Sequence, residues 1–149
     1  MWNDLKRYRE IPPDRRRLLR EALFALAIAR IAMAIVPFRR IAAWLGTPGA
    51  KGPDMASLEA IRAAEAVGWA VEVLGPRVPW DGRCLARALA ATSMLRRRGF
   101  EGTVSFGVSE GESAKFDAHA WLRVGSCIVT GGPCHERYRT LTTFSRGQS

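Results

Sequence analysis

The sequence predicts an α+β fold in which helices pack on one face of a small antiparallel sheet. The first observation is that apolar residues recur at helical spacing up to residue 99. The second is that residues 103–108 then alternate between apolar and polar side chains, as in a half-buried strand. The third is that further strand-like segments follow. Helices first and strands last are typical of the α+β class.

The length and composition fit one globular domain. The chain has 149 residues, of which 48% are hydrophobic and 25% are charged, as in an average soluble protein. We expect a single domain over 1–149, with a helical N-terminal part over 1–50 and a core over 54–149 that carries the candidate site. Three cysteines are too few for a disulfide scaffold, and no signal-peptide pattern follows Met1. These features predict a cytoplasmic protein with reduced thiols.

The N-terminal part predicts a long helix from Asp14 to Val36. Its start is marked by Pro12-Pro13 just ahead of the Asp14 carboxylate. The apolar stretch 22–36 is interrupted by Arg30 and is shorter than the roughly 20 residues of a membrane span. The sequence therefore predicts a buried or partner-facing helix and no transmembrane span. A peripheral membrane helix is the alternative, because basic residues flank both ends.

Three more helices are expected, over residues 41–45, 58–74 and 84–98. The Gly/Pro-rich stretch 46–53 is the expected linker after the first of them. Ser57 is the expected N-terminal cap of the second, which ends at Gly75-Pro76. The third ends in three arginines and Gly99, and a glycine there takes up the left-handed conformation of a helix cap.

The C-terminal third predicts antiparallel strands. They are expected over 103–108, 116–124 and 127–130, with a polar turn at 110–113 and a tight turn at 125–126. The glycines and proline at 131–133 end the last of these strands. The tail from Glu136 is expected to be a short strand or loop that then frays.

Cys84 is the most informative residue for function. A thiol in the first turn of a helix lies beside unsatisfied N–H groups and the positive end of the helix dipole. Both favour the thiolate, which is the nucleophilic form. The preceding turn, with Pro79 and Gly82, is expected to leave the thiol accessible. The alternative is that Cys84 is a small buried apolar residue, which is common for cytosolic cysteines.

His119 supplies a possible base for this thiol. Alternation along the predicted strand places Asp117, His119 and Trp121 on one face. An imidazole on a sheet packed against the cysteine helix can take the thiol proton and later give it to the leaving amine. Each residue alone would more often be structural. Together, in this order and on these elements, they predict Cys–His nucleophilic catalysis.

A third group should orient the imidazole. A hairpin closed at residues 125–126 sets Trp121 opposite Thr130 and His119 opposite Gly132, where no carboxylate lies. Asp117 on the histidine's own strand is therefore the preferred candidate. The alternatives are Thr130, Glu136 and a backbone carbonyl.

Other chemistries have weaker support. The formal net charge of +9 favours an anionic partner. The run Arg15-Arg16-Arg17 with Arg20 is interpreted as a solvated helix face, since no nucleic-acid-binding motif accompanies it. Cys134-His135 with Cys84 or Cys127 makes only a weak zinc candidate without a C-x-x-C pair. No phosphate-binding glycine loop is present in the sequence.

Several motifs together resemble one family. They are Pro79-Trp80 before Cys84-Leu85, residues 95–99 at the end of the cysteine helix, Phe106-Gly107-Val108 and the segment Phe116–Trp121. This set is similar to the lasso-peptide biosynthesis B protein, the transglutaminase-like leader peptidase, in the split form that lacks a leader-recognition domain. The N-terminal Trp2 and the helix up to Pro37-Phe38-Arg39 also resemble that family.

The resemblance implies a papain/transglutaminase-like fold and cleavage of a ribosomally made precursor between leader and core. It implies a Cys–His–Asp triad in which Cys84 is the nucleophile and His119 the base. The family's acid is expected on the strand after the histidine, near Gly131, where this sequence has none. The implied partners are a separate leader-binding protein and an ATP-dependent lasso cyclase, and the peptidase itself needs no metal or nucleotide cofactor.

A second hypothesis belongs to another class. A non-catalytic adaptor with the same fold would bind peptide, protein or nucleic acid through its arginines. The Cys84–His119 pair favours the peptidase, and we expect no nucleic acid partner. The high charge and the missing acid favour the adaptor.

Overall fold

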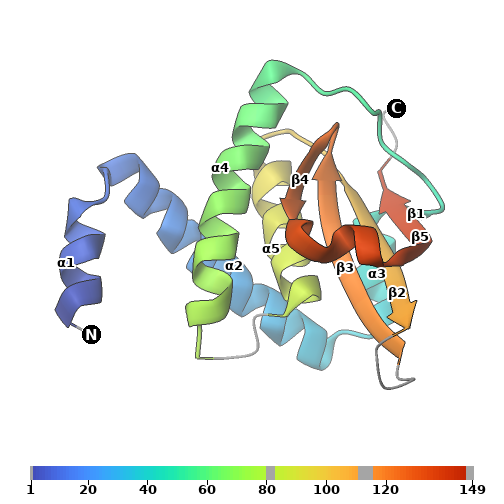
Figure 1. Ribbon diagram of the computed structural model, residues 1–149, viewed down its shortest axis with the longest axis horizontal. Helices are drawn as coiled ribbons and strands as arrows, with labels where there is room; N and C mark the ends of the chain where they lie inside the picture. Colours follow the sequence, from blue (N-terminus) through green and yellow to red (C-terminus); the bar gives the residue numbers. More distant parts are fainter. Residues whose placement is uncertain (1, 80–82, 111–115, 147–149) are drawn as a thin grey trace.

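The computed structural model describes residues 2–79, 83–110 and 116–146. In these ranges, helices cover one face of a five-stranded antiparallel sheet (Figure 1). The α+β class predicted from the sequence is therefore confirmed. The core of the expected turn before Cys84, at 80–82, and most of the polar turn at 110–113 lie outside the described residues.

The helices begin and end close to where local sequence signals predict. α2 (Pro13–Ile35) begins at a proline, which suits the first turn because an N–H there has no partner within the helix. The Ser57 hydroxyl accepts a hydrogen bond from the Ala60 N–H and caps α4 (Leu58–Leu74). Gly99, at φ +81°, follows α5 (Cys84–Arg97). The remaining helical segments are α1 (Trp2–Glu10), which has no predicted counterpart, α3 (Phe38–Leu45) and the 3-10 turn η1 (Gly75–Arg77).

The sheet corrects the expectation of a linker at 46–53 and shows that the tail, expected as a short strand or loop, forms a strand. Its strand order is β1-β5-β2-β3-β4, and the bounds are β1 (Thr47–Pro48), β2 (Thr103–Glu110), β3 (Phe116–Val124), β4 (Cys127–Thr130) and β5 (Arg139–Ser145). The stretch 46–53 is more than a linker, because Thr47 pairs with Ser145 at the edge of the sheet. The tail is a full strand, β5, between β1 and β2. Both strands depend on partners distant in the sequence, which local patterns do not reveal.

The register between β3 and β4 also differs from the prediction. Thr130 pairs with Leu122 and not with Trp121, because the register shifts between Leu122 and Arg123. Val129 is the extra residue of this bulge. Val129 lies against α4 at Gly68, where a Cβ added to the glycine would lie 2.6 Å from the Val129 carbonyl oxygen. The close approach of helix and strand thus accompanies a bulge that the sequence pattern alone does not show.

The core lies between the helices and one face of the sheet. Leu26 of α2, Val67 of α4 and Leu95 of α5 are buried in one cluster with residues of the sheet. In β3, Leu122 and Val124 belong to this cluster. Because side chains alternate along a strand, His119 falls on the other face of β3. The 3-10 segment η2 (Gly132–Arg137) lies against β3 (Figure 1).

Candidate functional site

Cys84 is the first residue of α5, as predicted, and its side chain is half-buried. The preceding residue, Arg83, has extended backbone, and within the described residues no side chain caps this end of the helix. Among the described residues, the first-turn N–H groups therefore have no capping side chain. Such N–H groups and the helix dipole stabilise a thiolate or an oxyanion. This end of α5 thus has the electrostatics that a nucleophilic cysteine needs.

His119 is half-buried on β3, where it pairs with Gly107 of β2. Its ring stacks on Tyr138 at 4.7 Å between centroids and on Trp121 at 5.8 Å. Gly107 makes room for this arrangement, because a Cβ there would lie 2.9 Å from the Trp121 ring. The two aromatic contacts fix the plane of the imidazole.

The Nε2 atom of His119 lies 3.0 Å from the carbonyl oxygen of Gly131. A carbonyl oxygen only accepts hydrogen bonds, so Nε2 is the nitrogen that carries the proton in this contact. In the neutral ring, Nδ1 then has the free lone pair. The contact therefore sets the tautomer in which Nδ1 can act as a base.

Gly131 is the residue that permits this contact. Its φ is +75°, in the left-handed region that favours glycine. An added Cβ would lie 2.8 Å from Nε2 of His119 and 2.9 Å from the Trp121 Cβ. The double glycine at 131–132, expected only to end a strand, therefore also brings backbone against the imidazole.

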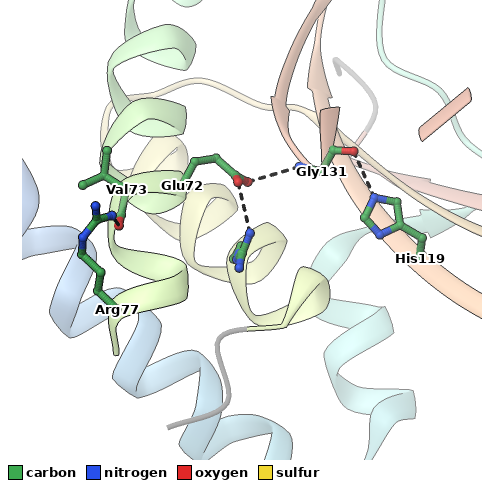
Figure 2. Close-up of polar contacts among 6 residues, drawn as sticks. Glu72, Val73, Arg77, His119 and Gly131 are labelled. Atoms are coloured by element: carbon green, nitrogen blue, oxygen red, sulfur yellow. Dashed lines mark hydrogen bonds and ion pairs between the residues drawn. The ribbon is translucent and has the colours of Figure 1, made fainter. Parts of the chain in front are cut away.

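A second contact joins Gly131 to the helices. Its N–H donates to Oε1 of Glu72 in α4 at 3.2 Å. The other carboxylate oxygen of Glu72 pairs with Arg87 of α5 at 3.1 Å. Figure 2 shows Glu72, Gly131 and His119 in this sequence of contacts. Since Arg87 lies three residues after Cys84, the chain of contacts runs from His119 to the first turns of the helix that Cys84 begins.

The predicted nucleophile and base lie on elements that contact each other, α5 and β3, but His119 falls on the face of β3 opposite the helices. Within the described residues, no hydrogen bond joins the Cys84 thiol to the His119 ring. Catalytic hydrogen bonds are often long in unliganded enzymes and tighten with substrate. The contacts that start at His119 thus end at Arg87, in the helix that Cys84 begins.

The structure separates the candidates for the orienting group. Among the residues that the structure describes, the buried Thr130 hydroxyl oxygen has no hydrogen-bond partner, so it does not hold the ring. Glu136 is exposed on η2. Asp117 pairs with Ser109 through its place in β3, and its side chain lies outside the described residues. The backbone carbonyl of Gly131 is the group that contacts the ring nitrogen, and sequence patterns give no signal for such a group.

Cys127 has the environment of a packing residue. It is half-buried and packs against the core cluster. Burial raises the pKa of the Cys127 thiol, and the negative charge of Glu65 raises it further. In the described part of the chain, no three His, Cys, Asp or Glu side chains gather as metal ligands would. The side chains of Cys134 and His135, named above as a weak zinc candidate, lie outside that part.

Several arginines have roles within the fold. Arg96 donates to the carbonyl oxygens of Trp44 and Leu45 at the end of α3 and stacks on the Trp44 ring at 4.4 Å. Arg98 pairs with Glu21 of α2 at 2.6 Å. Part of the positive charge therefore holds the helices together. No helix among the described residues is long and apolar enough to cross a membrane.

A cysteine that begins a helix and a histidine on a following antiparallel strand are the arrangement expected of a transglutaminase-like protein. The family model of the Transglutaminase-like superfamily matches residues 12–143, and the chain belongs to this superfamily. The superfamily includes cysteine peptidases. A search of curated proteins found no match, and a search of solved structures found none either.

Proposed function

We propose that the protein is a cysteine peptidase that cleaves the leader from a ribosomally made lasso-peptide precursor. The superfamily membership supports thiol chemistry, and the motif resemblance supports the substrate class. The observation that carries the proposal is the 3.0 Å contact between Nε2 of His119 and the Gly131 carbonyl. It leaves Nδ1 free to accept a proton.

The reaction follows from these roles. Nδ1 of His119 takes the proton of the Cys84 thiol, and the thiolate attacks the scissile carbonyl carbon. The tetrahedral intermediate collapses when the imidazolium gives the proton to the leaving amine nitrogen, which leaves a thioester on Cys84. Water, deprotonated by Nδ1, attacks the thioester carbon. The leader departs with its new C-terminal carboxylate, and the Cys84 thiolate takes back the proton from the imidazolium.

The N-terminus of α5 supplies the stabilisation of developing charge. The oxyanion forms next to Cys84, whose own N–H is among the uncapped groups of the first turn. Asp117 keeps its proposed role as the third catalytic residue, with one change. Because the Gly131 carbonyl already contacts Nε2, Asp117 would act mainly through its negative charge on the imidazolium.

The adaptor remains the second candidate function. It would keep the fold and bind through its basic surface. Arg87, Arg96 and Arg98 each engage acidic side chains or backbone carbonyls within the chain, so these three arginines are less available to an outside partner. This observation favours the peptidase, and we propose the cytoplasm as the compartment that keeps its thiol reduced.

The proposed partner is the leader-binding protein, with the ATP-dependent cyclase as a second candidate. α2 exposes an apolar stripe at helical spacing, made of Phe24, Ile28, Ile31 and Ile35. A cavity of about 360 Å³ adjoins it between α2, α3 and α5. The exposed fraction of Ile35 reaches 75%. Large apolar area beside charge is typical of a protein interface.

Removal of the residues before Ala50 would delete this surface, but point variants test it better. Leu19 and Leu26 of α2 are buried in the core, so such a truncation would remove part of the core. We expect Ile31→Asp with Ile35→Asp to weaken binding of the leader-binding protein by calorimetry. Met55→Asp, at a still more exposed position outside the stripe, is the control. Unchanged partner binding, or binding of anionic vesicles through the same residues, would contradict the assignment.

The function itself is tested by incubating the protein with candidate precursors, with and without the leader-binding protein. Mass spectrometry should show two products whose masses sum to the precursor plus one water. A precursor that binds and stays intact under all partner combinations would favour the adaptor. Sequencing the products locates the cleaved bond.

A further inference from the structure

Glu72 is an acidic residue outside the predicted site whose two oxygens have separate partners. Oε1 accepts a hydrogen bond from the Gly131 N–H, and Oε2 pairs with Arg87. Its side chain is 35% exposed, so neither contact is explained by the need to neutralise a deeply buried charge. Figure 2 places Glu72 across Gly131 from His119. The Glu72 carboxylate and the His119 imidazole thus contact the same residue, Gly131.

We infer that Glu72 is a positioning residue that orients the His119 ring through the backbone of Gly131. The inference rests on the proposed function for its meaning in catalysis. Residue 131 must be a glycine, because a Cβ would lie 2.8 Å from Nε2. Glycine is also the residue with the most backbone freedom. Without a restraint, its carbonyl would sample other directions and lose the ring nitrogen.

Glu72 supplies that restraint. It holds the N–H of Gly131 on one side, while the carbonyl of the same residue receives the Nε2 proton on the other. The N–H hydrogen bond fixes the peptide plane before Gly131 and thereby the position of the Cα from which the plane of the carbonyl turns. The direction of the carbonyl, and with it the tautomer of His119, then depends on the carboxylate.

Arg87 holds the carboxylate itself in place. Its guanidinium packs closely over Gly75 at the end of α4, where an added Cβ would collide with it. Arg87 also lies in the N-terminal part of α5, three residues after Cys84. The pair Glu72–Arg87 therefore ties the orientation of the proposed base to the helix that carries the proposed nucleophile.

The experiment measures the His119 tautomer in the full-length, isotope-labelled protein by 15N NMR. The chain has two histidines, so a His135→Gln variant assigns the signals. The wild-type neutral ring should carry its proton on Nε2. In Glu72→Ala the preference should weaken, whereas Glu72→Gln should retain it, because an amide oxygen still accepts from the Gly131 N–H.

Glu65→Ala is the matched control. Glu65 lies on α4 two helical turns before Glu72 and should leave the tautomer unchanged. In the cleavage assay, we expect Glu72→Ala to lower kcat roughly 2- to 13-fold, the factor of one ordinary hydrogen bond, with a smaller change in KM. Glu72→Gln should recover most of this loss.

The outcomes separate the two proposals. A wild-type tautomer in folded Glu72→Ala would overturn the positioning role. If that variant does not fold, Glu72→Leu, which fills the space without an acceptor, is measured in the same way. A tautomer shift in a protein that cleaves no precursor would uphold the positioning of His119 and refute the peptidase. Cleavage by the wild type with an unchanged kcat in Glu72→Ala would uphold the peptidase and refute the positioning role of Glu72.

Discussion

Replacement of Gly131 by alanine is the sharpest test of the site geometry. The substitution imposes two separate penalties. The residue has φ +75°, which a side chain disfavours. Its Cβ would also lie 2.8 Å from Nε2 of His119, 2.9 Å from the Trp121 Cβ and 3.0 Å from the Ala120 carbonyl oxygen. Since two of these neighbours are parts of the strand itself, the imidazole is the group that must move.

The expected magnitudes follow from these contacts. Left-handed backbone costs a non-glycine residue about 1–2 kcal/mol, and the more restricted unfolded chain offsets about 0.4–1 kcal/mol of this. Overpacking adds about 1–3 kcal/mol. The free energy of unfolding of Gly131→Ala should therefore fall by roughly 1–4 kcal/mol. If the ring also loses its carbonyl, the cleavage rate should drop at least 2- to 13-fold, on the order of one hydrogen bond.

Gly49→Ala separates the two penalties. Gly49 has φ +79°, and nothing lies within 4 Å of an added Cβ, so this variant carries the backbone term alone. Urea unfolding of both variants gives the steric term as their difference, and the precursor assay gives the effect on catalysis. Equal stability losses together with a wild-type cleavage rate for Gly131→Ala would refute the contact between Gly131 and His119.

Three further outcomes are expected. Cys84→Ala should abolish leader cleavage with little loss of stability, because the residue begins a helix and is only half-buried; Cys127→Ala should remain active, and mass spectrometry of the products checks both. Asp117→Asn should lower turnover without abolishing it, because a backbone carbonyl still holds the ring; steady-state kinetics that show a complete loss would contradict this. The hydrogen bond from Arg98 lowers the pKa of Glu21. The Glu21 carboxylate therefore stabilises the fold at pH values above the ordinary glutamate pKa of about 4.3. This stabilisation is lost as the pH falls through the lowered pKa. Glu21→Gln should therefore flatten the acid limb of a stability–pH curve, and an identical curve in urea titrations would show that the pair contributes nothing.

Local signals predicted the helical part of the fold well. Ser57 and Gly99 act at short range, and the structure places both caps as expected. The strands at the edges of the sheet were harder to predict. β1 has two residues and forms only because β5 lies beside it, and β5 itself pairs with strands far back in the chain. Such pairing depends on the whole fold and leaves little trace in local alternation.

In the candidate site, too, local patterns predicted some of the groups and not others. Cys84 and His119 could be assigned to a helix start and a strand, because periodicity and glycine-rich turns predict element types. The group on the imidazole could not be found. A backbone carbonyl has no residue type, and the bulge at Val129 shifted the expected partners of β3 by one position. Glu72, in a helix well before the other site residues, carried no motif that pointed to His119.

In a Cys–His–Asp triad, one carboxylate performs two tasks. In this protein the Gly131 carbonyl can perform only one of them. A carboxylate fixes the tautomer of the imidazole and also stabilises the imidazolium by its charge. A carbonyl fixes the tautomer but carries no net charge, and the carboxylate that accepts from the Gly131 N–H, Glu72, is already paired with Arg87. Charge stabilisation must then come from another acid, and strand alternation predicts Asp117 on the face of His119. Asp117→Asn should therefore lower the rate and leave the tautomer intact, whereas Glu72→Ala should disturb the tautomer first. Measuring both properties in both variants decides whether the two tasks are separate in this protein.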